Sequence, residues 1–521
     1  MQHADNWPTK TNLPMKLRLS IALCLALVFS LAQAQDEIAD SVLNIALWGD
    51  EFDLPRTESI KELRVLRNGK PLLVTSDQDH LYLRGLEPES LFLGTSITLT
   101  STEEKTIADY AIVGDSLHTL IKVGSKSKGY SHELVIYRIA GQNQGEVLRK
   151  DVGINISNLQ KSVQPIFFGV SDNGHYTVAC RQTKFLPHQL ATFHVSLSNN
   201  VKGNEAQFEL PTQIEGDDLK ILAAAAADNG LVYIVAHTGI KLNSPFRKKY
   251  LLYSFDPKAN TLHEFDFAAQ DIFNQELILD IDAEGVKAVA LYHTDPLTEN
   301  QSNGYTYIRF NGAGTDVIDK NINAFSAEMI KAHYEEKELL SANEISSLYL
   351  NKLVMCGDIP MVVFEKFYKD QICQTDPRTG IITCTDQFHY NGLTFENLNN
   401  RQNTVTINRQ QIDYDFQGNY TSHQIVADSN RLLVFYNDHY KNVGLSADKV
   451  MNNASRSAMR LVVVNCNNTL ETWKLTEDRQ ADFVFMPSIE MPRFQNNIYL
   501  LSSNGRAYKL GKIDLAKLPT P

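Results

Sequence analysis

Residues 114–117, Gly-Asp-Ser-Leu, spell a motif in which a serine acts as the nucleophile of a hydrolase. That chemistry also needs a histidine base, which in such enzymes stands three residues after an aspartate near the C-terminus. The two Asp-x-x-His matches, Asp77 to His80 and Asp172 to His175, lie in the first half of the chain instead. Because the tetrapeptide also separates two β-prone runs, we predict that it forms a turn rather than a catalytic site.

The fourteen histidines and six cysteines show no spacing that is typical of a metal site. There is no His-x-His, His-Glu-x-x-His or Cys-x-x-Cys, so the sequence predicts no metal, no cofactor and no catalytic residue. Paired acids occur within 50–53, 280–282 and 413–415. Such pairs could hold calcium or hydrolyse a glycosidic bond, but they lack a complete calcium loop and acidic turns are common.

Polar and aromatic residues are densest directly after one apolar run, at Asn437, Asp438, His439, Tyr440 and Lys441. A second stretch of this kind, Tyr368 and Lys369, follows another apolar run. Loops carry ligand-binding residues more often than the core does. We therefore predict that these seven residues contribute to a binding surface, with ordinary connecting loops as the alternative.

Cys373 and Cys384 flank a turn-forming segment, residues 376–380, which reads Asp-Pro-Arg-Thr-Gly. Pro favours the first corner of a turn, and Gly allows a positive φ. The residues between each cysteine and this segment are β-prone. A hairpin centred on the turn places the two cysteines opposite each other, within reach of a disulfide. We predict that disulfide; two neighbouring reduced cysteines are the alternative.

The first 34 residues are typical of an upstream extension followed by a secretory signal peptide. Residues 15–18 carry two positive charges, residues 21–31 are almost wholly apolar, and Ala32-Gln33-Ala34 forms a small-x-small cleavage box. About eleven residues rise only about 16 Å as a helix, which is too short for a bilayer core of about 30 Å. We predict an exported protein, periplasmic or extracellular, without a transmembrane span.

The composition is that of an ordinary soluble protein. The chain has 521 residues, of which 43% are hydrophobic and 21% are charged, and its formal net charge is −12. These values exclude collagen-like and disordered chains. The excess of acid argues against nucleic acid as a partner, because binding phosphate needs a positive surface.

Short β-prone runs, separated by turn residues, recur from about residue 42 to the end of the chain. The clearest units repeat a strand, a polar turn and a second strand around Gly174, Gly230 and Gly285, which are 56 and 55 residues apart. Four strands in each unit of roughly 50 residues are typical of a β-propeller blade. We therefore predict an all-β fold in which residues 35–521 form a single β-propeller domain, with a β-sandwich array as the alternative.

Six units lie near 106–152, 163–210, 219–268, 275–321, 345–412 and 423–474. A strand at 43–48 is expected to complete the last blade, which closes the ring and removes its free edges. Seven blades are favoured if residues 42–100 serve mainly for closure; eight follow if 58–100 is a blade of its own. Residues 325–340 have apolar residues near helical spacing, and we predict an inserted helix there.

Several phrases follow one another in the C-terminal half: VVFEKFY at 362–368, YNGLTFENL at 390–398, INRQQ at 407–411, LLVFYNDHYKN at 432–442 and NNIYLLSSNGRAYKLGKIDL at 496–515. In these phrases the chain resembles a group of uncharacterised exported bacterial β-propeller proteins, common in Bacteroidetes-type genomes. The resemblance implies a propeller and export, over about residues 42–515, and no activity. INRQQ departs from the Lys-x-Gln pattern that the group often has.

These patterns favour an exported, non-catalytic propeller that binds a protein, a peptide or a cell-envelope component through a loop face. The alternative is a propeller hydrolase or lyase acting on glycans or esters. That activity needs two carboxylates, or a serine and a histidine, that converge at one end of the central channel.

Overall fold

The computed structural model describes residues 42–519 apart from 88, 90, 92, 126, 142–143, 157–164, 240–247, 268–272, 283–284, 296–300, 334–343, 400–403, 415–417, 468 and 477–482. The predicted extension, signal peptide and cleavage site lie outside the described residues. Among the residues that are described, no helix is long and apolar enough to span a bilayer.

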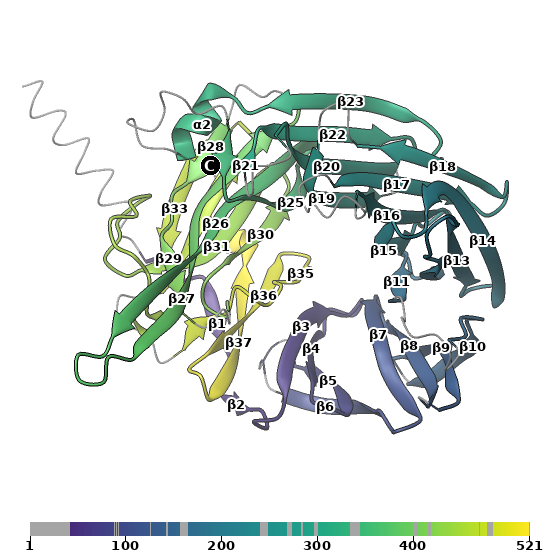
Figure 1. Ribbon diagram of the computed structural model, residues 1–521. Helices are drawn as coiled ribbons and strands as arrows, with labels where there is room; N and C mark the ends of the chain where they lie inside the picture. The colour runs from purple at the N-terminus through teal and green to yellow at the C-terminus, as the bar shows by residue number, and fades with distance from the viewer. Residues whose placement is uncertain are drawn as a thin grey trace, which may run out of the picture.

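Antiparallel sheets, each built mostly from consecutive strands, make up the molecule and are arranged as a ring (Figure 1). The described part of the chain contains eight sheets with at least four strands. The first strands of neighbouring sheets contact one another, for example β11 with β15 and β25 with β30, and they lie toward the centre of the ring. The protein is therefore a β-propeller.

The strands of the first five sheets are, in chain order, β3 (Ser59–Val65), β4 (Pro71–Ser76), β5 (His80–Leu86) and β6 (Leu93–Thr100); β7 (Lys105–Val113), β8 (Ser116–Ser125), β9 (Gly129–Arg138) and β10 (Gly145–Asp151); β11 (Phe167–Val170), β12 (Tyr176–Lys184), β13 (Leu190–Asn199) and β14 (Asn204–Glu215); β15 (Lys220–Ala226), β16 (Val232–Thr238), β17 (Lys249–Asp256) and β18 (Thr261–Asp266); and β19 (Phe273–Asp282), β20 (Gly285–His293), β22 (Gly304–Phe310) and β23 (Val317–Ala324).

The strands of the remaining three sheets are β25 (Leu348–Cys356), β26 (Ile359–Thr375), β27 (Ile382–Asn397), β28 (Thr404–Ile407) and β29 (Gln411–Asp413); β30 (His423–Asp428), β31 (Arg431–His439), β32 (Ser457–Asn465) and β33 (Leu470–Lys474); and β34 (Val484–Phe485), β35 (Arg493–Phe494), β36 (Asn497–Ser503) and β37 (Ala507–Asp514) with β1 (Ala46–Trp48) and β2 (Phe52–Asp53). A separate short pair joins β21 (Gln301–Ser302) to β24 (Ile345–Ser346).

The first and the last of the described strands close the ring. β1 pairs antiparallel with β37, so that Ala46 lies opposite Ile513, and β2 pairs with the other end of the same strand. An N-terminal strand therefore completes the last sheet, as the sequence predicts. Closure in this way leaves the ring without a gap between its first and last sheets.

The expectation that residues 42–100 serve mainly for closure is wrong. Residues 59–100 form a four-stranded sheet of their own, β3 to β6, and β1 and β2 alone pair with the last sheet. The alternative of eight blades required that residues 58–100 form a blade of their own. The segment has its own buried residues, Leu63 and Leu73, which pack against Leu501 of the last sheet.

The hydrophobic core lies between neighbouring sheets. Inner strands such as β20 are buried along their whole length, which explains why several of the runs are continuously apolar. Five of the first strands also contain a bulge near their N-terminal end, at Ile60/Glu62, Ile107/Asp109, Ile221/Ala223, Asn274/Glu276 and Leu350/Lys352. These bulges recur at the same place in the unit, which is a repeat that the turn glycines alone do not reveal.

A helix, α2 (Ala327–His333), lies within the segment predicted to be helical, and it buries Met329 and His333. The rest of that segment, from residue 334 on, lies outside the described residues. Buried His333 places its Nε2 3.0 Å from the hydroxyl of Thr394, and α2 therefore packs against the sheet that contains β27.

Candidate functional site

The outer halves of β26 and β27 leave their sheet and project from the ring as a hairpin (Figure 1). We call residues 369–385 the arm, because every residue in this range is exposed. The two strands are 17 and 16 residues long, whereas their partner β25 ends its pairing with β26 at Lys366. The arm is therefore a two-stranded ribbon beyond the end of its sheet.

A disulfide and a tight turn hold the arm together. Cys373 is joined to Cys384, with their Cα atoms 4.0 Å apart. At the tip, Asp376 Oδ1 accepts hydrogen bonds from the backbone N–H groups of Arg378 and Thr379, at 2.7 and 3.2 Å. An isolated two-stranded ribbon is at best marginally stable in water, so these covalent and turn contacts are what define its conformation.

The arm exposes large apolar side chains. Ile372 is 43% exposed, and Ile381 and Ile382 at the tip are 62% and 65% exposed. Exposed apolar residues that stand singly are normal, but here three stand within one short, projecting ribbon.

The predicted site residues Tyr368 and Lys369 lie at the base of the arm. The ring of Tyr368 stacks on that of His389, at 4.4 Å between centroids and 7° between planes. Lys369 Nζ lies 2.6 Å from Asp386 Oδ2 in an ion pair that is exposed to solvent. Both residues thus present side chains at the surface, where they are available to a partner.

The structure gives the first two residues of the other predicted stretch a structural role. Asn437 and Asp438 belong to β31 and are 1% and 3% exposed. The Asn437 side-chain amide donates to the carbonyl oxygens of Tyr420 and Phe485, at 2.9 and 2.7 Å. The accessible part of this stretch is His439, Tyr440 and Lys441, of which the first two have stacked rings.

Asp438 is part of a buried charged cluster. Its Oδ2 lies 2.7 Å from Arg460 Nε, and its Oδ1 accepts from the side-chain amide of Asn442 at 2.7 Å. Arg460 also donates to the carbonyl oxygens of Gly444 and Asn442. Burial raises the pKa of Asp438, and the charge of Arg460 opposes that rise. The cluster fixes the loop that follows β31 against β32.

The two predicted stretches are connected through β29. His389 at the arm base pairs with Ile412, and the Ile412 N–H donates to the carbonyl of Met451 at 2.9 Å. Met451 follows the loop that begins at Tyr440. A cavity of about 220 Å³ lies here, lined in part by Tyr414 and Tyr420. We call Tyr368, Lys369, His389, β29 and residues 439–452 the arm-base surface.

A second buried charged cluster, which was not predicted from the sequence, lies between the β25–β28 and β30–β33 sheets. Arg409, 1% exposed, forms an ion pair with Glu365 and donates to Gln411 Oε1 at 2.9 Å. Asn351 donates to the other oxygen of Glu365 at 3.1 Å and lies 3.0 Å from His423 Nε2. These residues come from four separate segments, so no local spacing could have revealed them.

Glu276 lies near this cluster, at the bulge of β19. Its Oε2 accepts a hydrogen bond from the Leu350 N–H at 2.6 Å. Burial raises the pKa of Glu276 to about 7, and the charge of Glu365 adds to this rise. Its carboxyl group therefore changes charge near neutral pH.

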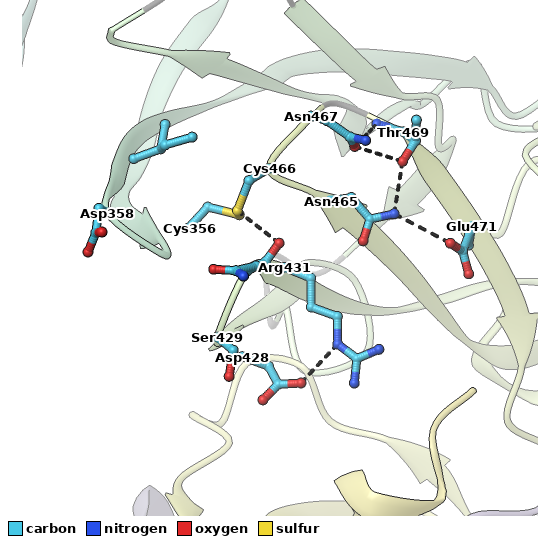
Figure 2. A pocket seen from close by; sticks show the side chains of 12 residues that line it. Cys356, Asp358, Asp428, Ser429, Arg431, Asn465, Cys466, Asn467, Thr469 and Glu471 are labelled. Carbon is cyan, nitrogen blue, oxygen red and sulfur yellow. Dashed lines mark hydrogen bonds and ion pairs between the residues drawn. A yellow bond between two sulfur atoms is a disulfide. The ribbon is translucent and has the colours of Figure 1, made fainter. Parts of the chain in front are cut away.

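A second disulfide, also missed from the sequence, links neighbouring sheets. Cys356 at the end of β25 is joined to Cys466 just after β32, 110 residues further on (Figure 2). The signal available was that the two cysteines lie in consecutive predicted repeat units, 345–412 and 423–474. The remaining cysteine of the described residues, Cys180, is free and buried, and burial raises its pKa.

A cleft of about 880 Å³ opens beside this disulfide. Figure 2 shows the side chains around it, among which the Arg431 guanidinium reaches Asp428 at 2.9 Å. Asn465 donates to Thr469 Oγ1 at 2.9 Å and contacts Glu471. Most of its polar lining is thus already bonded within the protein, and in the described part of the chain no group of three or more His, Cys, Asp or Glu is placed to hold a metal ion.

The hydrolase-like tetrapeptide is a turn. It joins β7 to β8, Gly114 has a φ of +57°, and Asp115 Oδ1 accepts from the Arg67 N–H at 2.9 Å. Ser116 is the first residue of β8 and pairs with Val113. The Asp77 and His80 side chains do lie together, 3.0 Å apart, but in the β4–β5 turn of another sheet.

Comparison with known proteins adds no assignment of function. No family model and no curated protein matches the chain. Among solved structures, the WD40 domain of SCAP from fission yeast aligns with a TM-score of 0.36 and 8% identity, over 93% of this chain and 97% of that one. An uncharacterized protein from Listeria monocytogenes aligns with a TM-score of 0.35 and 9% identity, over 87% and 92% of the two chains.

A post-proline cleaving enzyme from Rickettsia typhi aligns with a TM-score of 0.36 and 8% identity. The alignment covers 86% of this chain and 58% of the enzyme. None of these similarities bears on activity, and the assignment of the propeller rests on the sheet topology described above.

Proposed function

We propose that this protein is an exported, non-catalytic β-propeller that binds a protein, a peptide or a cell-envelope component through the arm and the arm-base surface. The observation that carries the proposal is the arm itself: seventeen consecutive exposed residues, 369–385, held in one conformation by a disulfide and a bonded turn. A ribbon whose residues are all exposed contributes little to the core. Exposing its apolar tip to water is unfavourable, and a bound partner that covers the tip would remove this cost.

The charges of the region support binding rather than catalysis. The buried carboxylates Glu365 and Asp438 are paired with Arg409 and Arg460, and neither carboxylate is left free to act on a substrate. Asp428 is paired with Arg431. A glycan-cleaving or ester-cleaving site would need carboxylates, or a Ser/His pair, that face an open cleft.

The two disulfides support export, since disulfides form and persist in oxidising compartments. Across the arm and the arm-base surface the formal charges balance, with Lys369, Arg378, Lys441 and Lys449 against Asp370, Asp376, Asp413 and Asp448. We therefore infer a neutral, partly apolar partner surface. We also propose that the chain is exported, like the propeller proteins that it resembles.

The test is capture of envelope components by the immobilised chain from residue 35 on, followed by measurement of the affinity for the captured component. Ile381→Ser/Ile382→Ser removes the apolar tip, and we expect at least a tenfold loss of affinity. The matched control is Ile318→Ser/Ile322→Ser on the rim strand β23, where the side chains are 54% and 42% exposed. Equal affinity of the two double variants would overturn the proposal.

A further inference from the structure

Along the arm, none of the described strands lies beside the outer edge of β26. β25 pairs with β26 as far as Lys366, and β29 and β28 pair with β27 from Phe388 to Glu396. Among the described residues, neither edge of the arm therefore has a ladder partner. Unpaired strand edges are templates for another strand, and natural proteins usually protect them with proline, lysine or a bulge. From Asp370 to Thr375 this edge has neither proline nor lysine.

The register of the hairpin identifies which backbone groups point outward. Cys373 and Cys384 face each other with Cα atoms 4.0 Å apart, a spacing typical of a non-hydrogen-bonded pair in an antiparallel ladder. In such a pair, the N–H and C=O groups of both residues point away from the partner strand. Because the pattern alternates, Lys369, Gln371, Cys373 and Thr375 all direct their backbone groups to the outer edge of β26.

This edge is complementary to itself. When a second copy is placed antiparallel, with the two-fold axis at Ile372, Gln371 of each copy lies opposite Cys373 of the other. Lys369 then lies opposite Thr375, so all four outward-pointing residues pair with outward-pointing residues. Asp370 lies opposite Gln374, like charges do not face each other, and Ile372 meets the same residue of the other copy.

The other edge fits a second copy less well. On β27 the residues with outward-pointing groups are Ile382, Cys384 and Asp386, by the same alternation. A two-fold pairing centred there joins three residues from each copy rather than four. It also uses Ile382, which belongs to the tip assigned above to partner binding.

We propose that two copies of this protein associate through the β26 edge of the arm, Lys369 to Thr375, to form a continuous four-stranded sheet about a two-fold axis at Ile372. The occupant of the edge is thus a second copy, in an isologous contact. This inference does not depend on the proposed binding function, since it concerns the backbone edge and not the tip. Pairing would present two tips and two arm-base surfaces, which raises the apparent affinity for a multivalent partner.

The first experiment measures mass by analytical ultracentrifugation over a concentration series to about 100 µM. Gln371→Pro removes one outward N–H, which in the single chain donates to Asp370 Oδ1 at 2.7 Å, and with it the side-chain hydrogen bond from Gln371 Nε2 to Asp386 Oδ1. It removes no backbone hydrogen bond of the hairpin, because the Gln371 backbone groups point away from β27. We expect the wild-type chain to form dimers and Gln371→Pro to weaken them at least tenfold. The control, Ile382→Pro, removes one outward backbone N–H on the other edge and should leave the dimer unchanged. Thermal melting of each variant checks that the ring is folded.

The second experiment tests the register by crosslinking. In the proposed pair, Ile372→Cys places two thiols directly opposite, about 4.5 Å apart at Cα, and an oxidant should join them. Gln374→Cys is the control: it is equally close to Cys373, but the two introduced thiols would stand four residues apart, about 13 Å along the strands. A monomer at all concentrations, a dimer that Gln371→Pro does not weaken, or equal crosslinking of both variants would overturn the proposal. Any of these results would leave the binding test with the tip variant unaffected.

Discussion

The buried pair Asp438–Arg460 decides whether the predicted binding stretch is a ligand site or part of the scaffold. Asp438→Asn keeps the size of the side chain and removes its charge. The two side chains are 4% and 1% exposed, and they meet at 2.7 Å. The substitution therefore leaves a guanidinium in the interior without its counter-charge.

The expected cost follows from the environment of Arg460. Breaking a buried ion pair by removing one partner typically costs about 3–5 kcal/mol. Arg460 keeps its hydrogen bonds to the carbonyl oxygens of Gly444 and Asn442. We therefore expect the lower end, about 3 kcal/mol less free energy of unfolding. The double variant Asp438→Asn/Arg460→Met should lose less than the two single losses combined, since it leaves no charge uncompensated.

The assay is urea unfolding at pH 7, followed by circular dichroism, with free energies taken from transitions of equal slope. The control is Asp386→Asn, which breaks the exposed ion pair with Lys369 and should leave the stability close to that of the wild type. If Asp438→Asn is as stable as the control, the pair does not hold the loop, and Asp438 returns to the candidate ligand-binding residues.

Three further changes have defined outcomes. Glu276→Gln should be more stable than the wild type at pH 8 and equal to it near pH 4. The pKa of Glu276 rises from 4.5 to about 7 on folding, so the free energy of unfolding of the wild type falls as pH increases across that interval, by up to about 3 kcal/mol at 1.36 kcal/mol per pH unit. A difference between the two proteins that does not depend on pH in urea unfolding would contradict this. Cys356→Ser/Cys466→Ser opens a link across 110 residues and should lower the free energy of unfolding by about 2–5 kcal/mol in the same assay. Cys373→Ser/Cys384→Ser should leave global unfolding nearly unchanged and raise amide hydrogen exchange in the arm at least tenfold; unchanged exchange would show that the ribbon is stable without the crosslink.

The features predicted correctly from the sequence are those that a short segment determines by itself: the repeated unit, the turn and the helix. The spacing of Gly174, Gly230 and Gly285 pointed to a repeated unit, and all three have a positive φ in the structure. The turn at 114–117 and the helix beginning near 325 also follow from short segments. In each case the residues that determine the conformation are neighbours in the sequence.

The features that the sequence did not reveal depend on which segments pack together. Whether residues 59–100 close the ring or form their own sheet depends on which strands they pair with. The Asn68-Gly69 turn between β3 and β4 was a signal for a hairpin there. A polar run after an apolar one looked like a loop, but Arg460, 22 residues away, makes Asp438 part of the interior. Predicting the Cys356–Cys466 disulfide requires knowing that consecutive units are neighbours in the ring.

The arm connects the two proposals through its geometry. In the two-fold pairing, Thr375 near the tip of one arm lies opposite Lys369 at the base of the other. Each tip, with Ile381 and Ile382, then lies beside the Tyr368 and Lys369 of the second copy. A partner bound by the pair would contact the apolar tip of one chain and the aromatic, charged base of the other. Dimer formation and partner binding would then be coupled, and Gln371→Pro would weaken both, whereas loss of the tip alone would weaken binding and leave the dimer intact.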